Sequence, residues 1–471
     1  MRKNYLFTIW LASFVITNAY SQAGKQYTGS WAGKLNVGVE ISIIFHITEE
    51  NNKLVTLMDS PDQSAFDIAT DETTLTAEGI LISLKKMNVS FSGRLVNDST
   101  IDGVFRQGTP LPLILKKITK TIEKKVKPQT PVPPFPYTSQ DVVYKNKAGT
   151  ADLAATLTIP AGRGPFPAVV LVSGSGAQNR NADMLGHSFF AVLADHLTRH
   201  GIAVLRYDER GVGKSGGNFA SATTRDFADD AEAGINYLLT RKETDKAKVG
   251  IIGHSEGGLV APMVASQRSD IDFIIMLAGP GIQTLEMMAE QNEAIVKTSG
   301  ASDEAAGAFR QLYREVVTAL LSQPDSLQKT IAFLEGWAAG KDGKMLEALN
   351  LATTEKRQGY VSAMGKQLQS GWLKYFMALN PADYLEKLTC KALALNGGKD
   401  IQVLAASNLA GIRESLEKSK SPAYEVKEIP GLNHLFQACN KCSLDEYGSL
   451  DETFSPAALQ LITDWLTKYV K

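Results

Sequence analysis

Ser255 lies in the stretch GHSEGG, with Gly253 two residues before it and Gly257 two residues after it. The apolar run KVGII precedes this stretch, and an apolar segment with helical spacing follows it. A serine at such a strand-to-helix turn is typical of a nucleophile elbow, where a strained backbone lifts the hydroxyl clear of the chain. A tight turn that only needs small residues is the plainer interpretation, but the flanking strand and helix favour the elbow.

A serine hydroxyl needs a base to accept its proton, and the base needs a group that orients it. Asp400 ends the stretch LALNGGKD, directly after an apolar strand, and His434 lies in IPGLNHLF, on the loop after the last predicted strand. The order Ser255, Asp400, His434 is the order expected with an elbow serine. The sequence therefore predicts acyl transfer by a triad, with His434 as base and Asp400 as its orienting group.

Acyl transfer builds negative charge on the carbonyl oxygen, which backbone N–H groups stabilise. One donor should be the amide of Glu256, immediately after the nucleophile. We expect the second from the loop SGSG that follows AVVLV, from the amide of Ser175 or Gly176. A plain glycine turn is the alternative for this loop.

The remaining histidines fit the role of base less well. His196 and His200 are spaced i, i+4, as in some zinc sites, but their helix lacks the H-E-x-x-H glutamate, which favours a solvated face. His254 is inside the elbow and too close in sequence to be the usual base. His46 lies on a predicted strand far from the other motifs.

Two phosphate-binding patterns can be dismissed. GVGKSG at 211–216 matches G-x-G-x-x-G, but charged residues separate it from its strand and no acid ends a second strand about 20 residues on. GKS at 213–215 would need a glycine at 208 for a Walker pattern, and Asp208 stands there. The sequence therefore predicts no cofactor.

Three cysteines are present, and Cys439 and Cys442 form C-N-K-C. A zinc site would need two more ligands, and only His434 is close, so no metal is expected. A redox motif would need a thioredoxin-like setting, which is absent. A loop disulfide or two free thiols remain open, and Cys390 is expected on a buried strand.

Composition and the first residues indicate the class of protein and its compartment. The net charge of −1 gives no basic bias toward nucleic acid, and the 44% hydrophobic content is that of an ordinary globular protein. Arg2 and Lys3 precede an apolar run to Thr17, and small residues surround position 21. Residues 1–21 therefore read as a signal peptide, which predicts export to the periplasm or medium with no integral membrane segment afterwards.

Two different hydrophobic patterns along the chain predict the elements that must position these residues. Residues 24–118 show short alternating segments broken by turns, which predict a small antiparallel barrel or sandwich. A proline-rich linker, 119–136, follows. From 137 to 471 strands alternate with helical patterns, which predicts a mostly parallel sheet with helices on both faces. The series is interrupted at about 282–380 by an insertion of helical pattern.

The insertion is rich in large apolar side chains, which could form a wall for an acyl group or only pack its own core. These side chains are Met287, Met288, Trp337, Met345, Met364, Trp372 and Phe376.

The motifs VSGSGAQNR, RYDERGVGKSGG, GHSEGG, LNGGKD and GLNHLF, in this order, resemble α/β-hydrolases. They are most similar to exported bacterial carboxylesterases grouped with serine aminopeptidase-like hydrolases, some of which carry a β-domain like the one predicted here. The resemblance implies an α/β-hydrolase fold with a helical cap and the triad above, with Asp208 and Arg210 bracing the loop beside the site. Ser173 departs from the pattern, because many relatives have histidine there.

The expected activity is hydrolysis of small-molecule carboxylic esters. The alternatives are a peptidase or aminopeptidase on the same triad and, from another class, a non-catalytic ligand-binding protein. An aminopeptidase must hold the ammonium group of its substrate with carboxylates. We expect Arg210 to be the adjacent partner of Asp208 and Glu209, and Asp400 to pair with His434, so that Glu256 is the one acid left without a partner. This favours an esterase.

Overall fold

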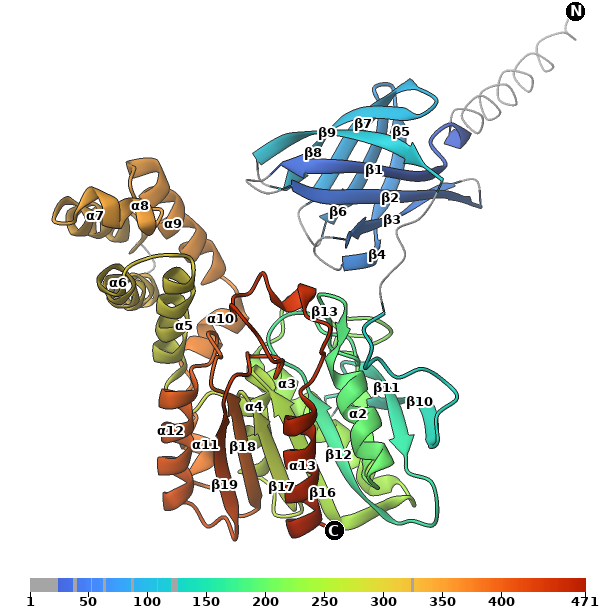
Figure 1. The fold of residues 1–471 in the computed structure, drawn as a ribbon, viewed down its shortest axis with the longest axis vertical. Helices are drawn as coiled ribbons and strands as arrows, with labels where there is room; N and C mark the ends of the chain where they lie inside the picture. The colour runs from blue at the N-terminus through green and yellow to red at the C-terminus, as the bar shows by residue number, and fades with distance from the viewer. Residues whose placement is uncertain are drawn as a thin grey trace, which may run out of the picture. The chain divides into compact units, whose positions relative to one another are not determined.

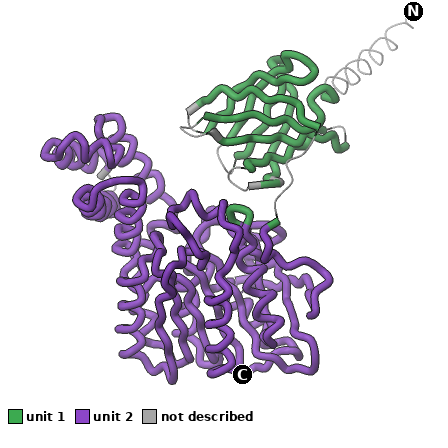
Figure 2. Tube along the Cα trace, viewed as in Figure 1, with its two compact units in different colours: residues 1–126, 184–186 green, residues 127–183, 187–471 purple. Residues whose placement is uncertain are grey.

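The computed structural model describes residues 24–36, 40–51, 53–61, 65–85, 89–107, 109–119, 126–146, 148–322 and 326–471. The predicted signal peptide lies outside these residues. The chain divides into two compact units, one of residues 1–126 with 184–186 and one of residues 127–183 with 187–471 (Figure 2). Within the described ranges, no helix has the length and apolar character needed to cross a bilayer.

The first unit is a single antiparallel sheet in the order β4-β3-β2-β1-β9-β8-β7-β6-β5. Because Thr73 on β5 donates a hydrogen bond to Thr56 on β3, at 2.8 Å, the two ends of the sheet approach each other and the sheet curls. One face buries an apolar core that includes Trp31, Phe45 and Phe91. The strands are β1 (Gly29–Asn36), β2 (Glu40–Glu50), β3 (Lys53–Ser60), β4 (Ala65–Ala69), β5 (Glu72–Thr76), β6 (Gly79–Leu84), β7 (Val89–Asn97), β8 (Thr100–Gln107) and β9 (Thr109–Ile118).

The second unit is built on an eight-stranded sheet in the order β10-β11-β15-β12-β16-β17-β18-β19. The pairs β10/β11 and β11/β15 are antiparallel, and from β15 to β19 the neighbouring strands are parallel. Among the parallel strands, β12 (FPAVVLV) and β17 (FIIML) are continuous apolar runs, as expected where both faces of a sheet are covered, whereas the edge strand β19 (YEVKEI) carries charged residues. The strands are β10 (Thr138–Lys145), β11 (Asp152–Ile159), β12 (Phe166–Val172), β15 (Ala203–Tyr207), β16 (Thr244–His254), β17 (Phe273–Leu277), β18 (Lys391–Gly397) and β19 (Tyr424–Ile429), with the short hairpin β13 (Asp183–Met184) and β14 (His187–Ser188) outside this sheet.

Helices cover both faces of this sheet (Figure 1). One apolar core joins the sheet to α2 (Phe189–Arg199) and α13 (Pro456–Tyr469). The other core joins it to α3 (Thr224–Thr240), α4 (Glu256–Ala265) and α12 (Ala405–Lys418). Successive residues of one strand, such as Val169 and Val170, enter opposite cores, because successive side chains of a strand point to opposite faces.

Among the described residues, seven helices lie between β17 and β18, and we call the first six of them the cap helices. They have an apolar core of their own that includes Phe309, Leu312 and Val316. They are α5 (Thr284–Thr298), α6 (Asp303–Ser322), α7 (Ser326–Ala339), α8 (Gly343–Ala348), α9 (Thr354–Gln367) and α10 (Gly371–Met377), and the short α11 (Ala382–Leu385) follows them.

The side chains proposed as an acyl wall divide between two cores. Met345, Met364 and Trp337 pack in the core of the cap helices. Met287 and Phe376 pack instead against the sheet and its helices. Trp372 contacts both clusters, so it joins the cap helices to the body of the second unit.

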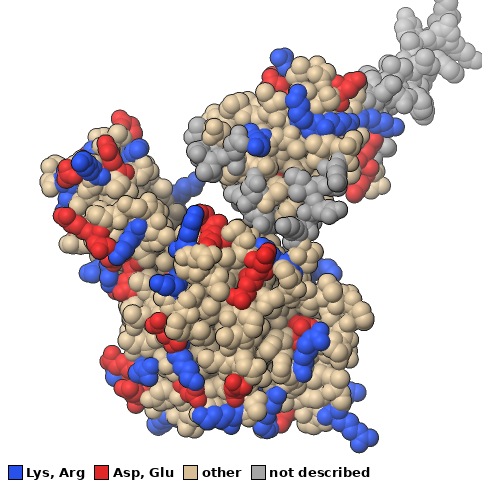
Figure 3. All heavy atoms as spheres, viewed as in Figure 1, with Lys and Arg blue, Asp and Glu red and all other residues tan. Residues whose placement is uncertain are grey.

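The start of the second unit is fixed to its last third. Lys127 donates from Nζ to the carbonyl oxygens of Gly448 and Leu450, and Gln129 bonds the backbone of Thr453 and Phe454. The proline-rich segment after Lys127 therefore runs along the second unit. On the face of this unit that Figure 3 shows, basic and acidic side chains are interspersed, consistent with the net charge of −1.

Candidate active site

The candidate residues all follow the carboxyl ends of parallel strands. Ser173 follows β12, Asp208 follows β15, Ser255 follows β16, Asp400 follows β18 and His434 lies in the loop after β19. Because these strands are parallel neighbours, their carboxyl ends meet at one edge of the sheet. Residues up to about 260 positions apart in the sequence are thereby placed at the same edge of the sheet.

Ser255 occupies a strained turn between β16 and α4. Its φ of 55° lies in the left-handed region, which side chains other than glycine rarely adopt. The backbone is held there because the Ser255 amide donates to Leu277 and the Ser255 carbonyl accepts from Gly258, both at 2.8 Å. At Gly257 a Cβ atom would lie 2.1 Å from the carbonyl oxygen of Val172, so only glycine permits this approach of helix to strand.

Asp400 and His434 form a buried hydrogen-bonded pair. Nδ1 of His434 lies 2.7 Å from Oδ2 of Asp400, and the two residues are 4% and 5% exposed. The other oxygen of Asp400 accepts the amides of Gln402 and Val403, at 2.7 and 2.9 Å. The carboxylate is thus fixed in place and leaves Nε2 of His434 as the nitrogen that can serve as base.

His254 holds the loop of His434 against the elbow. Its Nε2 lies 2.9 Å from the carbonyl oxygen of His434, and the two imidazole rings are 4.8 Å apart. Burial, with the neighbouring His434 ring, lowers the pKa of His254 to about 3. His254 is therefore neutral and donates to that carbonyl. Among the described residues no hydrogen bond joins the Ser255 hydroxyl to His434, a contact that in free enzymes often forms only with substrate.

The loop of residues 173–176 lies directly against the serine. A Cβ atom at Gly174 would be 2.9 Å from Cβ and 3.5 Å from Oγ of Ser255. The two serines on either side of Gly174 are bonded to buried acids: Ser173 donates to Glu209 at 2.7 Å and Ser175 donates to Glu256 at 2.9 Å. The amides of Ser175 and Gly176 are therefore carried by a loop with a fixed position.

Glu256 is not a spare acid, which corrects the expectation from sequence. Its side chain is buried and accepts hydrogen bonds from Ser175, Thr224 and Trp372, at 2.9, 2.7 and 2.8 Å. Burial raises its pKa, although the three donors favour the charged form. The sequence offered no signal for Thr224 or Trp372 as partners, because they come from α3 and α10.

Asp208 is paired with Arg180 and not with its neighbour Arg210, which is a second correction. Arg180 donates to Asp208 from its backbone and its guanidinium, and the amide of Lys214 adds a further bond. These bonds outweigh the opposing effect of burial and lower the pKa of Asp208. Asp208 thus joins the loop after β12 to the loop after β15.

Arg210 turns toward helix α3. Its guanidinium bonds Asp226 and Asp230, each at 2.7 Å. It fixes the loop after β15 to this helix. Asp208 and Arg210 of the RYDERG motif therefore both hold this loop in place, through partners that the sequence did not indicate.

Glu209 is the most perturbed acid beside the site. It is buried, and burial, with the nearby charge of Glu256, raises its pKa to about 8 even though Ser173 and the amide of Gln178 donate to it. In the folded protein Glu209 therefore keeps its proton to a higher pH than it does in the unfolded chain.

Replacing Glu209 by glutamine should raise stability at alkaline pH. The folded state must ionise a buried acid as the pH rises from the ordinary glutamate range through about 8, so the wild type loses stability over that window. Glutamine avoids this cost and can still bond Ser173 and Gln178, so we expect a gain of roughly 1–3 kcal/mol at pH 9 that vanishes near pH 5. Urea unfolding at both pH values measures it, with Glu417→Gln on the exposed side of α12 as control. An equal effect at the two pH values would contradict the assignment.

The cysteine pair lies in the loop that follows the histidine. Cys439 and Cys442 form a disulfide, whereas Cys390 is a buried free thiol just before β18. Glu446 accepts the amides of Asn440, Lys441 and Cys442, which closes the loop on itself.

The other histidines have structural partners. His196 bonds Thr463 on α13, and His200 bonds the carbonyl oxygen of His196. His187, on which the sequence gave no indication, is buried between Thr453 and the carbonyl oxygen of Tyr447. His46 lies in the first unit between Ser30 and Asp59, each at 2.8 Å.

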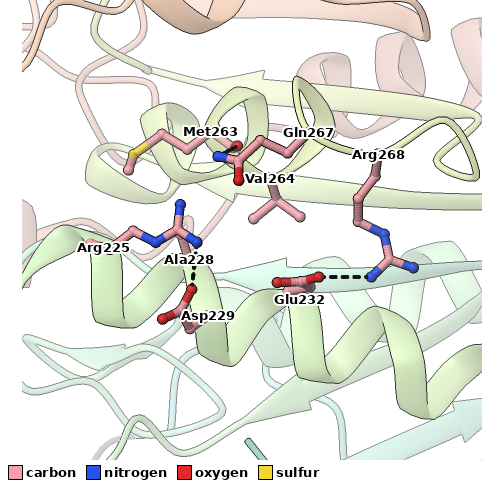
Figure 4. A pocket seen from close by; sticks show the side chains of 8 residues that line it. All are labelled: Arg225, Ala228, Asp229, Glu232, Met263, Val264, Gln267 and Arg268. Carbon is pink, nitrogen blue, oxygen red and sulfur yellow. Dashed lines mark hydrogen bonds and ion pairs between the residues drawn. The ribbon is translucent and has the colours of Figure 1, made fainter. Parts of the chain in front are cut away.

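Three hollows occur in the second unit, and one of them is lined in part by the candidate residue Asp400. Two, of about 420 and 430 Å³, share Ile401 and Lys441, and the second also includes Asp400. The third, between α3 and α4, has a volume of about 10 Å³ and is lined by the ion pairs Arg225–Asp229, within α3, and Glu232–Arg268 (Figure 4). It can hold about one water molecule, so it is not a substrate site.

Residues 184–333 match the family model described as serine aminopeptidase, S33. This range contains Ser255 and ends before Asp400. Esterase EstD of Thermotoga maritima is 30% identical over 335 residues, which cover 70% of this chain and 67% of that protein.

Among solved structures, the Pyrococcus furiosus esterase Pf2001 is 17% identical, with a TM-score of 0.44 over 75% of this chain and all of that one. Est1E of Butyrivibrio proteoclasticus, determined with ferulic acid, is also 17% identical, with a TM-score of 0.40 over 70% of this chain and 99% of that one.

Proposed function

This chain belongs to the α/β-hydrolase family that includes esterase EstD, and from that premise we propose that it is an exported carboxylesterase with Ser255 as nucleophile, His434 as base and Asp400 as orienting group. The chain is a hydrolase of this family. The observation that carries the finer assignment is the buried Asp400–His434 pair beside a serine at φ 55°.

The reaction uses these residues in two halves. Nε2 of His434 accepts the proton of Ser255 Oγ while Oγ bonds the carbonyl carbon of the ester. The negative carbonyl oxygen receives the N–H of Glu256 and that of Ser175 or Gly176. The intermediate then collapses, and the leaving alkoxide takes the proton from His434 and departs as the alcohol.

The second half reverses the roles. Water gives a proton to His434 and its oxygen bonds the acyl carbon, and the new intermediate expels Ser255 Oγ, which recovers the proton. The products are a carboxylic acid and an alcohol, and no metal or cofactor takes part in the proposed steps.

An aminopeptidase is disfavoured because the nearby acids have partners. Asp208 pairs with Arg180, Glu209 with Ser173 and Gln178, and Glu256 with three donors. An ammonium ion at any of these would have to displace a bond already made in a buried place. A non-catalytic binding protein is disfavoured too, since a binding surface has no use for a serine held at a positive φ.

Export is supported by residues 1–21 and by the Cys439–Cys442 disulfide. The first residues have the charged start, apolar run and small residues of a signal peptide. Disulfides persist mainly in oxidising compartments such as the bacterial periplasm.

The activity is tested by comparing matched esters and anilides. We expect kcat/KM for p-nitrophenyl butyrate to exceed that for aminoacyl p-nitroanilides by at least about 100-fold, which corresponds to about 2.7 kcal/mol. Esters carry a better leaving group, and each of the nearby acids Asp208, Glu209 and Glu256 already has partners that an ammonium group would have to displace. Anilides cleaved as fast as esters would replace this proposal with the peptidase.

A further inference from the structure

The Glu256 carboxylate joins three separate parts of the second unit. Ser175 belongs to the loop after β12, Thr224 begins α3, and Trp372 lies on α10 of the cap helices. Each donates one hydrogen bond to this carboxylate, which is 2% exposed. A buried carboxylate is stable only while its donors are in place, so the three parts depend on each other.

The bond from Ser175 acts on the loop that faces the nucleophile. The backbone of Gly174 lies so close to Ser255 that an added Cβ atom would be 2.9 Å from Cβ of Ser255, and the amides of Ser175 and Gly176 follow it in the chain. Glu209 holds this loop at Ser173 and Glu256 holds it at Ser175. A shift of the Glu256 side chain would therefore move the loop at the position where oxyanion donors must be accurate to fractions of an ångström.

The bond from Trp372 comes from the cap. The indole stacks on Phe376 of the same helix, with ring centres 5.5 Å apart, and its Nε1 lies 2.8 Å from Oε1 of Glu256. Oε1 also accepts the hydroxyl of Thr224, whereas Oε2 accepts that of Ser175. The cap thus bonds one oxygen of the carboxylate and the loop bonds the other.

We propose that Glu256 is a positioning residue through which Trp372 of the cap sets the geometry of the 173–176 loop, so that the seating of α10 controls the rate of the chemical step. This inference rests on the proposed acyl transfer at Ser255. It assigns to Trp372 a role in turnover that is separate from contact with the acyl chain.

The test is a double-mutant cycle on Trp372 and Ser175, the two residues that are joined through the Glu256 carboxylate. Trp372→Phe removes the indole N–H and keeps an aromatic ring against Phe376, and Ser175→Ala removes the loop hydroxyl. We expect each to lower kcat for p-nitrophenyl butyrate about 10-fold with KM changed less than about twofold, because an interaction with the transition state is lost. The double variant should also lose about 10-fold, since both changes break one connection.

Two comparisons keep the result specific. Trp337→Phe makes the same change on α7, within the core of the cap helices, and should leave kcat unaltered. Glu256→Gln can still accept from Thr224 and Trp372 on its oxygen and donate to Ser175, so it should have at least about 10-fold higher kcat than Glu256→Leu. Losses of about 100-fold in the double variant, or an effect on KM alone, would overturn the proposal.

The rate at which a fluorophosphonate labels Ser255 tests the positioning role of Glu256 independently of the natural substrate. Ser255 Oγ bonds phosphorus, its proton passes to His434 and fluoride leaves, so the reaction reports on the site whatever the natural substrate is. The Trp372→Phe, Ser175→Ala and double variants should label about 10-fold more slowly than wild type. If wild type labels but does not cleave esters, the proposed function fails and the cycle still stands. If labelling is equal in all variants, the positioning role fails.

Discussion

Replacing Ser255 by alanine is expected to lower kcat for p-nitrophenyl esters by about 10⁴- to 10⁶-fold. The change removes one oxygen atom and leaves Cβ in place, so the strained turn and its hydrogen bonds to Leu277 and Gly258 should persist. Without Oγ no acyl-enzyme can form, and only the polar environment of the site remains to assist direct attack by water. Initial rates over a range of ester concentrations, with enzyme in the micromolar range, measure the residual activity.

Ser266→Ala is the matched control for this loss. Ser266 is the C-cap residue directly after helix α4, and its hydroxyl donates to the carbonyl oxygen of Met263. It should retain wild-type kcat, and both variants should unfold at similar temperatures. A folded Ser255→Ala protein with wild-type turnover would exclude Ser255 as nucleophile.

Replacing Asp400 by asparagine should lower kcat by about 10³- to 10⁴-fold. The amides of Gln402 and Val403 both donate to Oδ1, so the asparagine oxygen will be kept on that side and its NH₂ group will face His434. Nδ1 must then accept a hydrogen bond, which moves the imidazole proton to Nε2. In that tautomer His434 cannot take the proton of Ser255. Steady-state kinetics at pH 7.5 measure the effect.

Asp464→Asn, at an exposed position of α13, supplies the control for Asp400, since its carboxylate accepts a hydrogen bond from Gln460 and lies on the surface. If the Asp400→Asn enzyme kept more than about a tenth of the wild-type kcat, His434 would not depend on Asp400 for its tautomer.

The sequence predicted which strand ends carry the candidate residues. In a parallel sheet the carboxyl ends meet at one edge, so strand order alone places Ser255, Asp400 and His434 at the same edge of the sheet. The pairing partners of the acids could not be predicted from strand order. Arg210 is adjacent to Glu209 in the chain, yet its guanidinium bonds two acids on α3, and Arg180 from another loop pairs with Asp208.

The hydrogen bond between Glu256 and Trp372 could not be predicted from the sequence either. The two residues are separated by 116 positions, and α10 belongs to an insertion whose packing no strand order specifies. The content of tryptophan, methionine and phenylalanine in that insertion suggested an apolar wall for an acyl group, with packing of its own core as the alternative, and the cap helices do have such a core. It did not indicate which indole N–H would reach a buried acid.

The first unit shows why residue types alone are insufficient. Ser30, His46 and Asp59 form a hydrogen-bonded series on the neighbouring strands β1, β2 and β3. Here Nδ1 of the histidine faces the serine and Nε2 faces the acid, and Ser30 lies within a regular strand. Ser255 differs by its strained turn and by the amides beside it, which are the features that acyl transfer requires.

The two ends of the cap insertion are bonded to each other at its base. The amide of Thr284 donates to Leu379 at 3.0 Å, and Gln283 donates from Nε2 to Met377 at 2.8 Å. The strands that precede and follow the insertion, β17 and β18, are direct neighbours in the sheet. In evolutionary terms this makes the insertion an exchangeable segment, because α6 to α9 can lengthen, shorten or be replaced without disturbing the sheet. Helix α10 is the exception, since a lineage that loses its tryptophan must find another donor for Glu256.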